Sequence, residues 1–313
     1  MSDKNAKTIL RFQQRVDNKE FYEAHQTIRT IVNRYVRSRQ FTPALDLLAQ
    51  GSAILAKNKE YASATDLILY MILVYQDAGI SCLDKERKMK LIELISLLPD
   101  TDPALSDLAK ASIAWSKATD ELTFGDSSLH HLFGCKLLGA VTSQPLDEMQ
   151  HKMFAVAELH LALGTFESLP VYVDYLFQWY LQSGAGADPG QFLARAVFNY
   201  AYLKNLQFLN SAIDRFVALY QRECCAVMEQ DGLLIVFPNL PLLVFLQLLA
   251  ATLAKADAGG KFMKLLNHYQ GQLNEYQLVA PVEYLGSLYF QLQLGNPNAG
   301  NNMLANLMGG LFK

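Results

Sequence analysis

Apolar residues recur at intervals of three and four through most of the chain, which is the pattern of amphipathic helices. Between residues 19 and 39, one helix face carries Phe21, Ala24, Ile28, Ile31, Val32 and Tyr35. The same period continues at Leu45, Leu48, Ile54 and Leu55, then at Leu67, Tyr70, Met71, Val74 and Ala78, and again at Leu91, Leu94, Ile95 and Leu98. The chain is therefore predicted to be mostly α-helical.

Short breaks separate these helices. They fall at residues 40–43, 57–60, 79–83, 99–103, 124–126, 143–145, 164, 184–190 and 258–260. Alternate breaks are roughly 35 to 45 residues apart, which is the length of a helix-turn-helix unit in solenoid proteins. Because one helix pair cannot bury its own apolar face, neighbouring pairs must stack. We predict an all-α fold, a right-handed α-solenoid of tetratricopeptide-like helix pairs. The repeats are degenerate, because the full tetratricopeptide signature is met nowhere.

One segment departs from the helical pattern. Two β-favouring runs, residues 224–228 and 233–237, flank Glu229-Gln230-Asp231-Gly232, and the Asp-Gly pair favours a tight turn. We expect one β-hairpin insertion near residues 224–237. Two strands alone are only marginally stable, so the hairpin should pack either on its own helices or on a partner, and both interpretations stay open.

An uncharged stretch from Gly232 to Ala254 is long enough to cross a bilayer. Pro238 and Pro241 interrupt it, and Gln247 would be unpaired in the hydrocarbon. We therefore interpret the stretch as a short strand, a turn and a buried helix from Leu242 onward.

Composition narrows the function. The 313 residues include 27 Lys and Arg against 30 Asp and Glu, and a net charge of -3 argues against wholesale binding to nucleic acid or to an anionic membrane. Four cysteines form no disulfide framework, and the polar amino terminus lacks the apolar stretch of a secretory signal. These features predict a reducing, cytosolic location.

No pattern of catalytic residues is present. The six histidines are scattered over the predicted helices without metal-ligand spacing, so we interpret them as structural. The glycine-rich residues 184–190 follow a helical run and no strand, which indicates an interhelical loop instead of a phosphate-binding one. We predict no enzymatic activity, no metal and no cofactor.

Charge is distributed unevenly. Residues 1–40 hold nine Lys and Arg against four Asp and Glu, a local balance of +5, and the remaining residues carry -8. Lys7, Arg11 and Arg15 share one helix face, and Arg34 and Arg37 share another. Such a cluster is either an ordinary solvated face or a binding surface for an acidic partner protein.

Residues 21–38 read FYEAHQTIRTIVNRYVRS, and this segment closely resembles the signature of the fourth subunit of the GET (guided entry of tail-anchored proteins) pathway in its fungal form. The resemblance continues through residues 65–68, 124–126, 195–200 and 245–249, in the same order, so it spans nearly the whole chain. It implies an all-helical solenoid with one hairpin, acting as a cytosolic scaffold without enzymatic activity.

The resemblance also implies partners. Residues 1–150 would dock the targeting ATPase that carries tail-anchored proteins, and would favour its ATP-loaded, poorly hydrolysing state. Residues 151–313, with the hairpin, would hold a ubiquitin-like subunit. That subunit would in turn recruit a small glutamine-rich tetratricopeptide cochaperone.

Matching positions assign these roles to particular residues. The resemblance implies ATPase docking by Lys7, Phe21, Arg34, Tyr35 and Arg37, and Arg11 lies on the same basic face as Lys7. Asp66 matches an acid that touches the ATPase beyond the main anchor and restrains ATP hydrolysis, whereas Leu73 stands where the family usually has a second acid. The ubiquitin-like subunit would contact Ile235, Phe237, Leu242, Phe245, Leu246 and Leu249.

Two alternative functions remain, and the first is from another functional class. A tetratricopeptide-type receptor for peptide tails would need basic residues on several successive helix pairs, but here they crowd into the first two helices. Another helical-repeat scaffold, of the proteasome-lid type, would end in a winged-helix module. Residues 301–310 show no strands of that kind.

Overall fold

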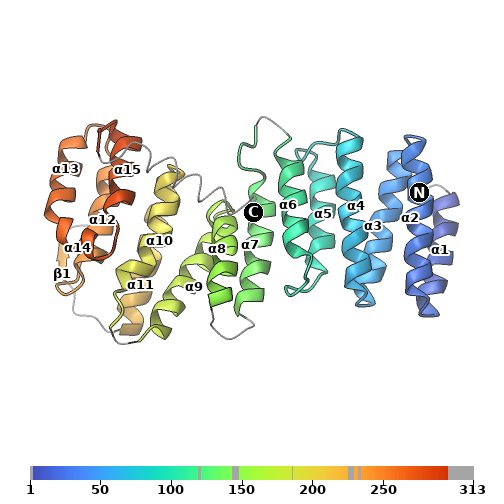
Figure 1. Ribbon diagram of the computed structural model, residues 1–313, viewed down its shortest axis with the longest axis horizontal. Helices are drawn as coiled ribbons and strands as arrows, with labels where there is room; N and C mark the ends of the chain where they lie inside the picture. The colour runs from blue at the N-terminus through green and yellow to red at the C-terminus, as the bar shows by residue number, and fades with distance from the viewer. Residues whose placement is uncertain are drawn as a thin grey trace. The chain divides into compact units, whose positions relative to one another are not determined.

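The computed structural model describes residues 3–118, 121–142, 148–184, 186–224, 229–231 and 234–294. The chain divides into two compact units, residues 1–164 and 165–313 (Figure 1). We expected the two halves to meet at residue 150, whereas the compact units divide after residue 164, because the helix at 148–162 packs against the preceding helix of the first unit. The assignment of one partner to each half stays a prediction.

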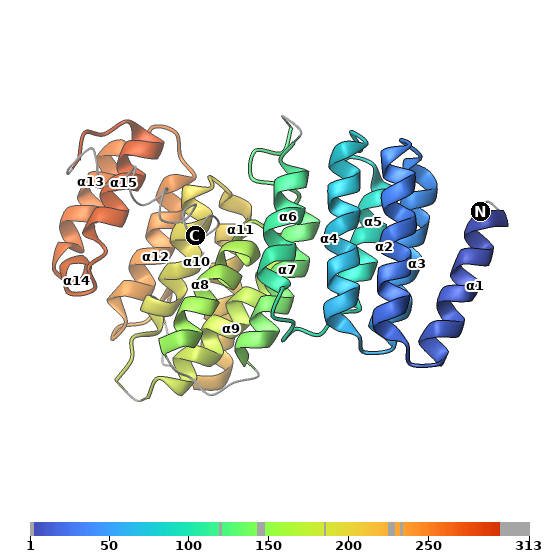
Figure 2. The ribbon, with the colours of Figure 1, turned by 45° about the vertical axis from the view of Figure 1, so that its right-hand side comes forward.

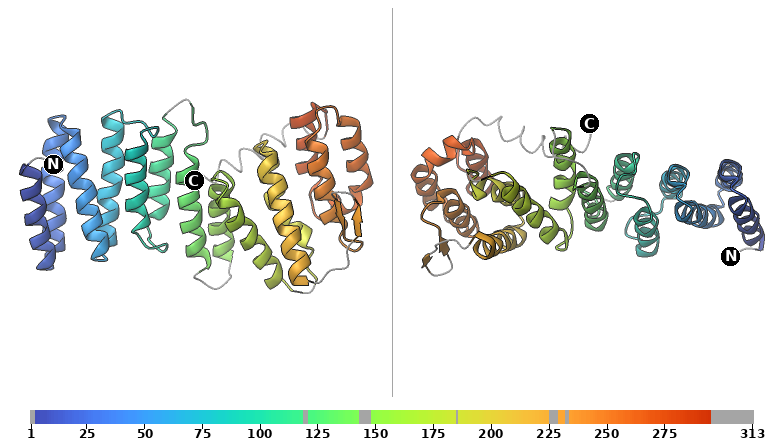
Figure 3. Two further views of the ribbon diagram at one scale, coloured as in Figure 1. Left: turned by 180° about the vertical axis from the view of Figure 1, so that it is seen from behind. Right: turned by 90° about the horizontal axis from the view of Figure 1, so that it is seen from below.

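The first unit consists of successive helices joined by short connections. They are α1 (Asp3–Asp17), α2 (Phe21–Arg37), α3 (Phe41–Lys57), α4 (Tyr61–Asp77), α5 (Lys85–Ser96), α6 (Leu105–Ser116), α7 (Ser127–Thr142) and α8 (Glu148–Ala162). Contacts between α1 and α3, α3 and α5, and α5 and α7 build one layer, while α2, α4 and α6 build the other (Figure 3). This arrangement confirms the predicted solenoid of helix pairs.

Helices α2, α3 and α4 repeat one another at a fixed interval. They begin with the aromatic residues at 21, 41 and 61, and they lie next to one another in the unit (Figure 2). The same interval relates three buried alanines, Ala24, Ala44 and Ala64. A small residue at this position lets neighbouring helices approach closely, so the three helices repeat the same packing contact.

Helices α1, α2, α3 and α4 each end in the same turn. Lys19, Arg39, Lys59 and Gly79 have φ values of 66°, 56°, 65° and 65°, in the left-handed region that terminates helices. Non-glycine residues rarely adopt this conformation. The connections are therefore defined by packing of the flanking helices more than by local preference.

The second unit contains α9 (Ser168–Gln182), α10 (Pro189–Tyr202), α11 (Leu206–Cys224), α12 (Pro241–Leu253), α13 (Gly259–His268), α14 (Gln270–Glu275) and α15 (Val279–Phe290). Helix α9 ends at Gln182 and α10 begins at Pro189, so the expected interhelical loop at residues 184–190 overlaps the first turn of α10. Helix α12 contacts α10, α11 and α13 and forms the apolar centre of this unit. Within the described residues, no helix is long and apolar enough to cross a bilayer.

A hairpin joins α11 to α12. Strands β1 (Glu229–Asp231) and β2 (Leu234–Val236) pair antiparallel, with Gln230 opposite Ile235. The predicted position of the first strand was wrong, because α11 continues to Cys224 and the residues that we took for the turn form β1. Most of the run we expected as the first strand, residues 225–228, lies outside the described residues. Contact between β2 and α12 supports the interpretation in which the hairpin packs on its own helices.

Candidate partner-binding surfaces

The first unit carries an exposed basic surface on α1 and α2, which contact each other. We define it by four exposed side chains, Lys7, Arg11, Arg34 and Arg37. Helical periodicity places Lys7 and Arg11 on the side of α1 opposite the buried Phe12. The basic surface is thus built from two elements with their apolar faces anchored in the core.

Other side chains near this surface serve to join α1 to α2. Arg15 Nη1 donates to the Glu23 carbonyl oxygen at 3.2 Å and to Thr27 Oγ1 at 2.5 Å. The Tyr35 hydroxyl donates to Asn5 Oδ1 at 3.1 Å. Tyr35 and Phe21, both predicted to dock the ATPase, are half-buried, so each also contributes to packing of the first unit.

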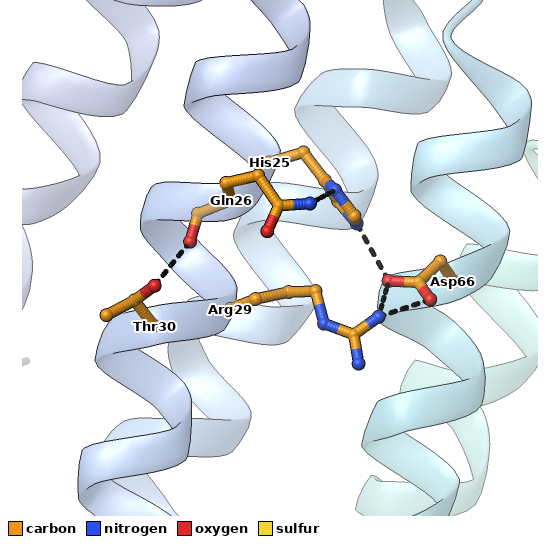
Figure 4. Close-up of polar contacts among 5 residues, drawn as sticks. All are labelled: His25, Gln26, Arg29, Thr30 and Asp66. Atoms are coloured by element: carbon orange, nitrogen blue, oxygen red, sulfur yellow. Dashed lines mark hydrogen bonds and ion pairs between the residues drawn. The ribbon is translucent and has the colours of Figure 1, made fainter.

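Asp66, on α4, lies beside α2, and two side chains of α2 bind its carboxylate (Figure 4). His25 Nε2 lies 2.7 Å from Asp66 Oδ2. Arg29 Nη1 donates to both carboxylate oxygens, at 2.5 Å and 2.6 Å. His25 and Arg29 are four residues apart and therefore lie one above the other on the same face of α2. Sequence reasoning found Asp66 but neither of these partners.

The tautomer of His25 follows from its second neighbour. The Gln26 side-chain amide nitrogen lies 3.4 Å from His25 Nδ1 and can only donate, so Nδ1 accepts. The proton of the neutral ring is then on Nε2, which donates to Asp66. Asp66 is thus held by one ring nitrogen of His25 and one terminal nitrogen of Arg29.

Helix α4 presents further side chains next to this cluster. The Arg29 guanidinium lies over the Tyr70 ring, 5.5 Å from its centroid, and the Tyr70 hydroxyl donates to Asn33 Oδ1. Leu73 is 56% exposed, which is unusual for a large apolar residue in a structured helix. The position at which the resemblance would place a second acid is therefore an accessible apolar side chain.

In the second unit, the hairpin is fixed to α12 by one glutamine. Gln247 Oε1 accepts from the Ile235 amide at 3.0 Å, and Gln247 Nε2 donates to the Ile235 carbonyl at 2.8 Å. Since Gln247 takes both backbone groups of Ile235, the Gln230–Ile235 pair is a non-hydrogen-bonded pair of the β-ladder. Gln247, expected to be unpaired in a bilayer, is fully paired inside the protein.

Burial separates the residues predicted to contact the ubiquitin-like subunit. Leu242, Phe245, Leu246 and Leu249 are 0% exposed and form the core of the second unit. Phe237 is buried as well, packed edge-on against Tyr220 with ring centroids 5.4 Å apart. A direct contact of these five side chains with a partner would require the core to open, so they act in the packing of the second unit. Only Ile235 is partly exposed.

Two histidines of the first unit, His130 and His160, are buried and hydrogen-bonded to each other, so their role is structural. His130 Nε2 donates to the Phe124 carbonyl at 2.9 Å, so its Nδ1 must accept from His160 Nδ1, also at 2.9 Å. Burial lowers the pKa of His130 to about 4 and that of His160 to about 3. Among the described residues, no group of three or more His, Cys, Asp or Glu could hold a metal ion.

Known proteins resemble this chain over almost its full length. The family model for Golgi to ER traffic protein 4 matches residues 38–312. Golgi to ER traffic protein 4 of Aspergillus fumigatus is 30% identical, over all of this chain and 91% of that protein. The protein of the same name from Schizosaccharomyces pombe is 28% identical, over 93% of this chain and 90% of that one.

A solved structure agrees with these relatives. The crystal structure of C. therm. Get4 superposes with a TM-score of 0.81 at 28% identity, covering 99% of this chain and 96% of that chain. The resemblance noted in residues 21–38 to the fungal fourth subunit of the GET pathway is thus confirmed across the fold. The chain belongs to the Golgi to ER traffic protein 4 family.

Proposed function

We propose that this protein is a cytosolic scaffold in the post-translational targeting of tail-anchored membrane proteins to the endoplasmic reticulum. Its first unit docks the targeting ATPase of the GET pathway. Its second unit holds the ubiquitin-like subunit, through which a small glutamine-rich cochaperone delivers the client. Two partners held on one chain meet at a raised effective concentration, so transfer needs no catalytic residue in the scaffold.

The observation that carries the docking part is the exposed basic surface of Lys7, Arg11, Arg34 and Arg37. Like charges on adjacent helices repel each other, so their clustering gives no stability to the isolated protein. Arginine binds carboxylates through a planar fork with two parallel hydrogen bonds. The basic surface therefore fits an acidic patch on the ATPase.

The regulatory part concerns Asp66 on α4. We propose that Asp66 and its neighbours restrain ATP hydrolysis by the docked ATPase, separately from the anchoring arginines. A scaffold that binds one nucleotide state more tightly than another shifts the population toward that state. Since Leu73 carries no charge, the restraint rests on the cluster around Asp66.

For the second unit, we propose that the hairpin forms part of the surface that holds the ubiquitin-like subunit. All three residues of β2, Leu234, Ile235 and Val236, are partly exposed apolar residues, while Phe237 and the core leucines of α12 fix the base of the hairpin. Partly exposed apolar side chains beside a buried core favour a permanent protein contact.

The test measures both partners on the same full-length protein by calorimetry. Arg34→Glu combined with Arg37→Glu should weaken ATPase binding by about two orders of magnitude, because two charge-assisted contacts become repulsive. The ubiquitin-like subunit should still bind this variant. Ile235→Asp should weaken binding of the ubiquitin-like subunit and leave ATPase binding unchanged.

A matched control reverses two exposed lysines of the second unit, Lys255→Glu with Lys261→Glu, which changes net charge by the same amount. This control should leave ATPase affinity within about threefold of the unchanged protein, because distant charges are screened. Equal losses of ATPase binding in the control and in the double arginine variant would contradict a specific basic docking surface.

A further inference from the structure

A cavity of about 340 Å³ lies between α5 and α7 of the first unit. Met89, Ile92 and Ser96 line it from α5, and Leu132 and Cys135 line it from α7. The lining positions on each helix are three or four residues apart, so the cavity follows both helices, for about two turns or roughly 10 Å along α5. We call it the α5–α7 groove. Helices α5 and α7 belong to one layer and α4 to the other, so the groove is separate from the contacts between α2 and α4 (Figure 3).

Charge inside the α5–α7 groove is already balanced. Among the described residues that line it, Lys136 is the single Lys, Arg, Asp or Glu. Its Nζ donates to the Leu98 carbonyl oxygen at 2.7 Å and to Asp100 Oδ1 at 2.8 Å, and its side chain is only 9% exposed. Burial raises the pKa of the Cys135 thiol, which therefore stays protonated at neutral pH. A charged side chain that entered the groove would lose its water and gain no counter-ion.

Helix α7 also lacks the charged outer face that exposed helices of globular proteins normally carry. Lys136 is the only Lys, Arg, Asp or Glu in its 16 residues, and it is buried. The partly exposed positions beside the groove are instead Ser128, Leu132 and Cys135. Across the groove, Met89 is 51% exposed, and methionine adapts its flexible side chain to many apolar surfaces. The two walls together form an accessible and largely uncharged contact surface.

The composition of the groove selects the secondary structure of its occupant. Polyproline segments dock on aromatic rings, and among the described lining residues none is Phe, Tyr or Trp. An added β-strand needs an exposed sheet edge, whereas both walls of the groove are helices. An amphipathic helix places apolar side chains at intervals of three and four, which is the spacing of the walls themselves.

We propose that the α5–α7 groove binds one amphipathic helix of a partner protein, which inserts about two turns of uncharged apolar side chains. Charge complementarity supports this occupant. An acidic helix face suits the basic surface of α1 and α2, but in the groove it would find Lys136 already paired with Asp100. The contact goes beyond the two partners of the proposed function and depends on neither of them.

The probe is a synthetic amphipathic peptide of about 16 residues, long enough to form a helix, with leucines at intervals of three and four on one face and Lys and Glu on the other. Fluorescence anisotropy follows its binding to the full-length protein. Labelling of the Cys135 thiol supplies a second readout, in a variant with Cys224→Ser and Cys225→Ser, since Cys82 is buried. The peptide should bind and should slow labelling of Cys135 severalfold. A peptide of the same composition with leucines at every second position should bind at least about tenfold more weakly.

Met89→Glu should weaken binding of the peptide at least about tenfold, because it adds an unpaired carboxylate to the wall of the groove. The matched control is Leu83→Glu, since Leu83 is 50% exposed and does not line the groove. This control should change the peptide affinity less than about threefold, as expected of a surface substitution outside the contact. Neither variant should change the affinity for the targeting ATPase. Equal weakening of peptide binding in the two variants would overturn the proposal.

Other outcomes of the same measurements would also overturn it. One is a peptide that does not bind, or that binds without protecting Cys135. Another is self-association of the protein, measured by sedimentation and abolished by Met89→Glu, which would identify a second copy of the chain as the occupant. A third is faster labelling of Cys135 in Leu304→Asp with Leu307→Asp, without peptide, which would identify the chain's own carboxy-terminal residues as the occupant.

Discussion

At the scale of single residues, the buried pair of His130 and His160 determines how the first unit responds to acid. Both rings are neutral, and one N–H···N hydrogen bond joins them. Burial lowers both pKa values well below the 6.5 of an accessible histidine. Between about pH 6.5 and pH 4 the unfolded chain therefore binds protons that the folded chain excludes, so stability falls as the pH falls.

We predict that the free energy of unfolding decreases by on the order of 4 kcal/mol between pH 7 and pH 5, about 2 kcal/mol for each of the two buried rings, because both must stay neutral in the folded protein. Urea unfolding at the two pH values measures this difference. His160→Leu should be less stable at pH 7, since His130 Nδ1 loses its donor, but its loss of stability on acidification should be smaller. His268→Asn, at an exposed histidine of α13, is the control and should keep the full pH dependence.

Residue-scale prediction from the sequence reached some side chains and not others. Asp66 was found by resemblance, whereas Arg29 and His25 were not, because they pair across 37 and 41 residues. Other polar links in the first unit have similar separations, 38 residues for Lys88 and Asp126 and 36 for Lys136 and Asp100. One helix pair separates each donor from its acceptor, so a repeat length read from the sequence could have proposed these partners.

At the scale of elements, the hydrophobic period predicted most of the helices, because their apolar faces are the ones buried. It placed the breaks near residues 40, 57 and 79, where helices of the first unit end. The hairpin was predicted in kind but its first strand was misplaced. A three-residue strand has too few positions for an alternating pattern to be recognised. The register of the hairpin also depends on contacts with α12, which the strand sequence does not encode.

The hairpin's dependence on α12 gives an element-scale prediction. Gln247→Leu should destabilise the protein by about 2 kcal/mol, because the Ile235 N–H and C=O lose their partners in a partly buried position. Amide hydrogen exchange at Ile235 should accelerate more than exchange within α12. Gln207→Leu, at an exposed position of α11, provides the comparison and should change neither quantity. Unchanged exchange at Ile235 would show that β1 alone holds the strand.

At the scale of the whole molecule, a net charge of -3 conceals two opposite contributions. Residues 1–40 carry +5 and the remainder carries -8. A sequence can report this imbalance directly, because charge needs no fold to be counted. It could not report that Lys7, Arg11, Arg34 and Arg37 form one exposed surface on two contacting helices, since that depends on how α1 and α2 pack.

The imbalance predicts that the two proposed partners respond differently to salt. Raising the salt concentration from 50 to 500 mM should weaken ATPase binding at least about tenfold, mainly through slower association, because exposed charges are screened within 10 Å at 0.1 M and less at higher salt. Binding of the ubiquitin-like subunit should change little, since the proposed contact at Ile235 is apolar. Both affinities can be measured on one preparation by calorimetry and stopped-flow mixing.

The variant Arg34→Glu with Arg37→Glu should flatten the salt dependence of the ATPase association rate, because attraction is replaced by repulsion that salt relieves. Lys255→Glu with Lys261→Glu, the same charge change in the second unit, should keep the original slope. If both partners lose affinity in parallel as salt rises, general charge would be responsible and not the basic surface of α1 and α2. A steep slope confined to the ATPase, and abolished only by the arginine variant, is the outcome expected of a localised electrostatic anchor.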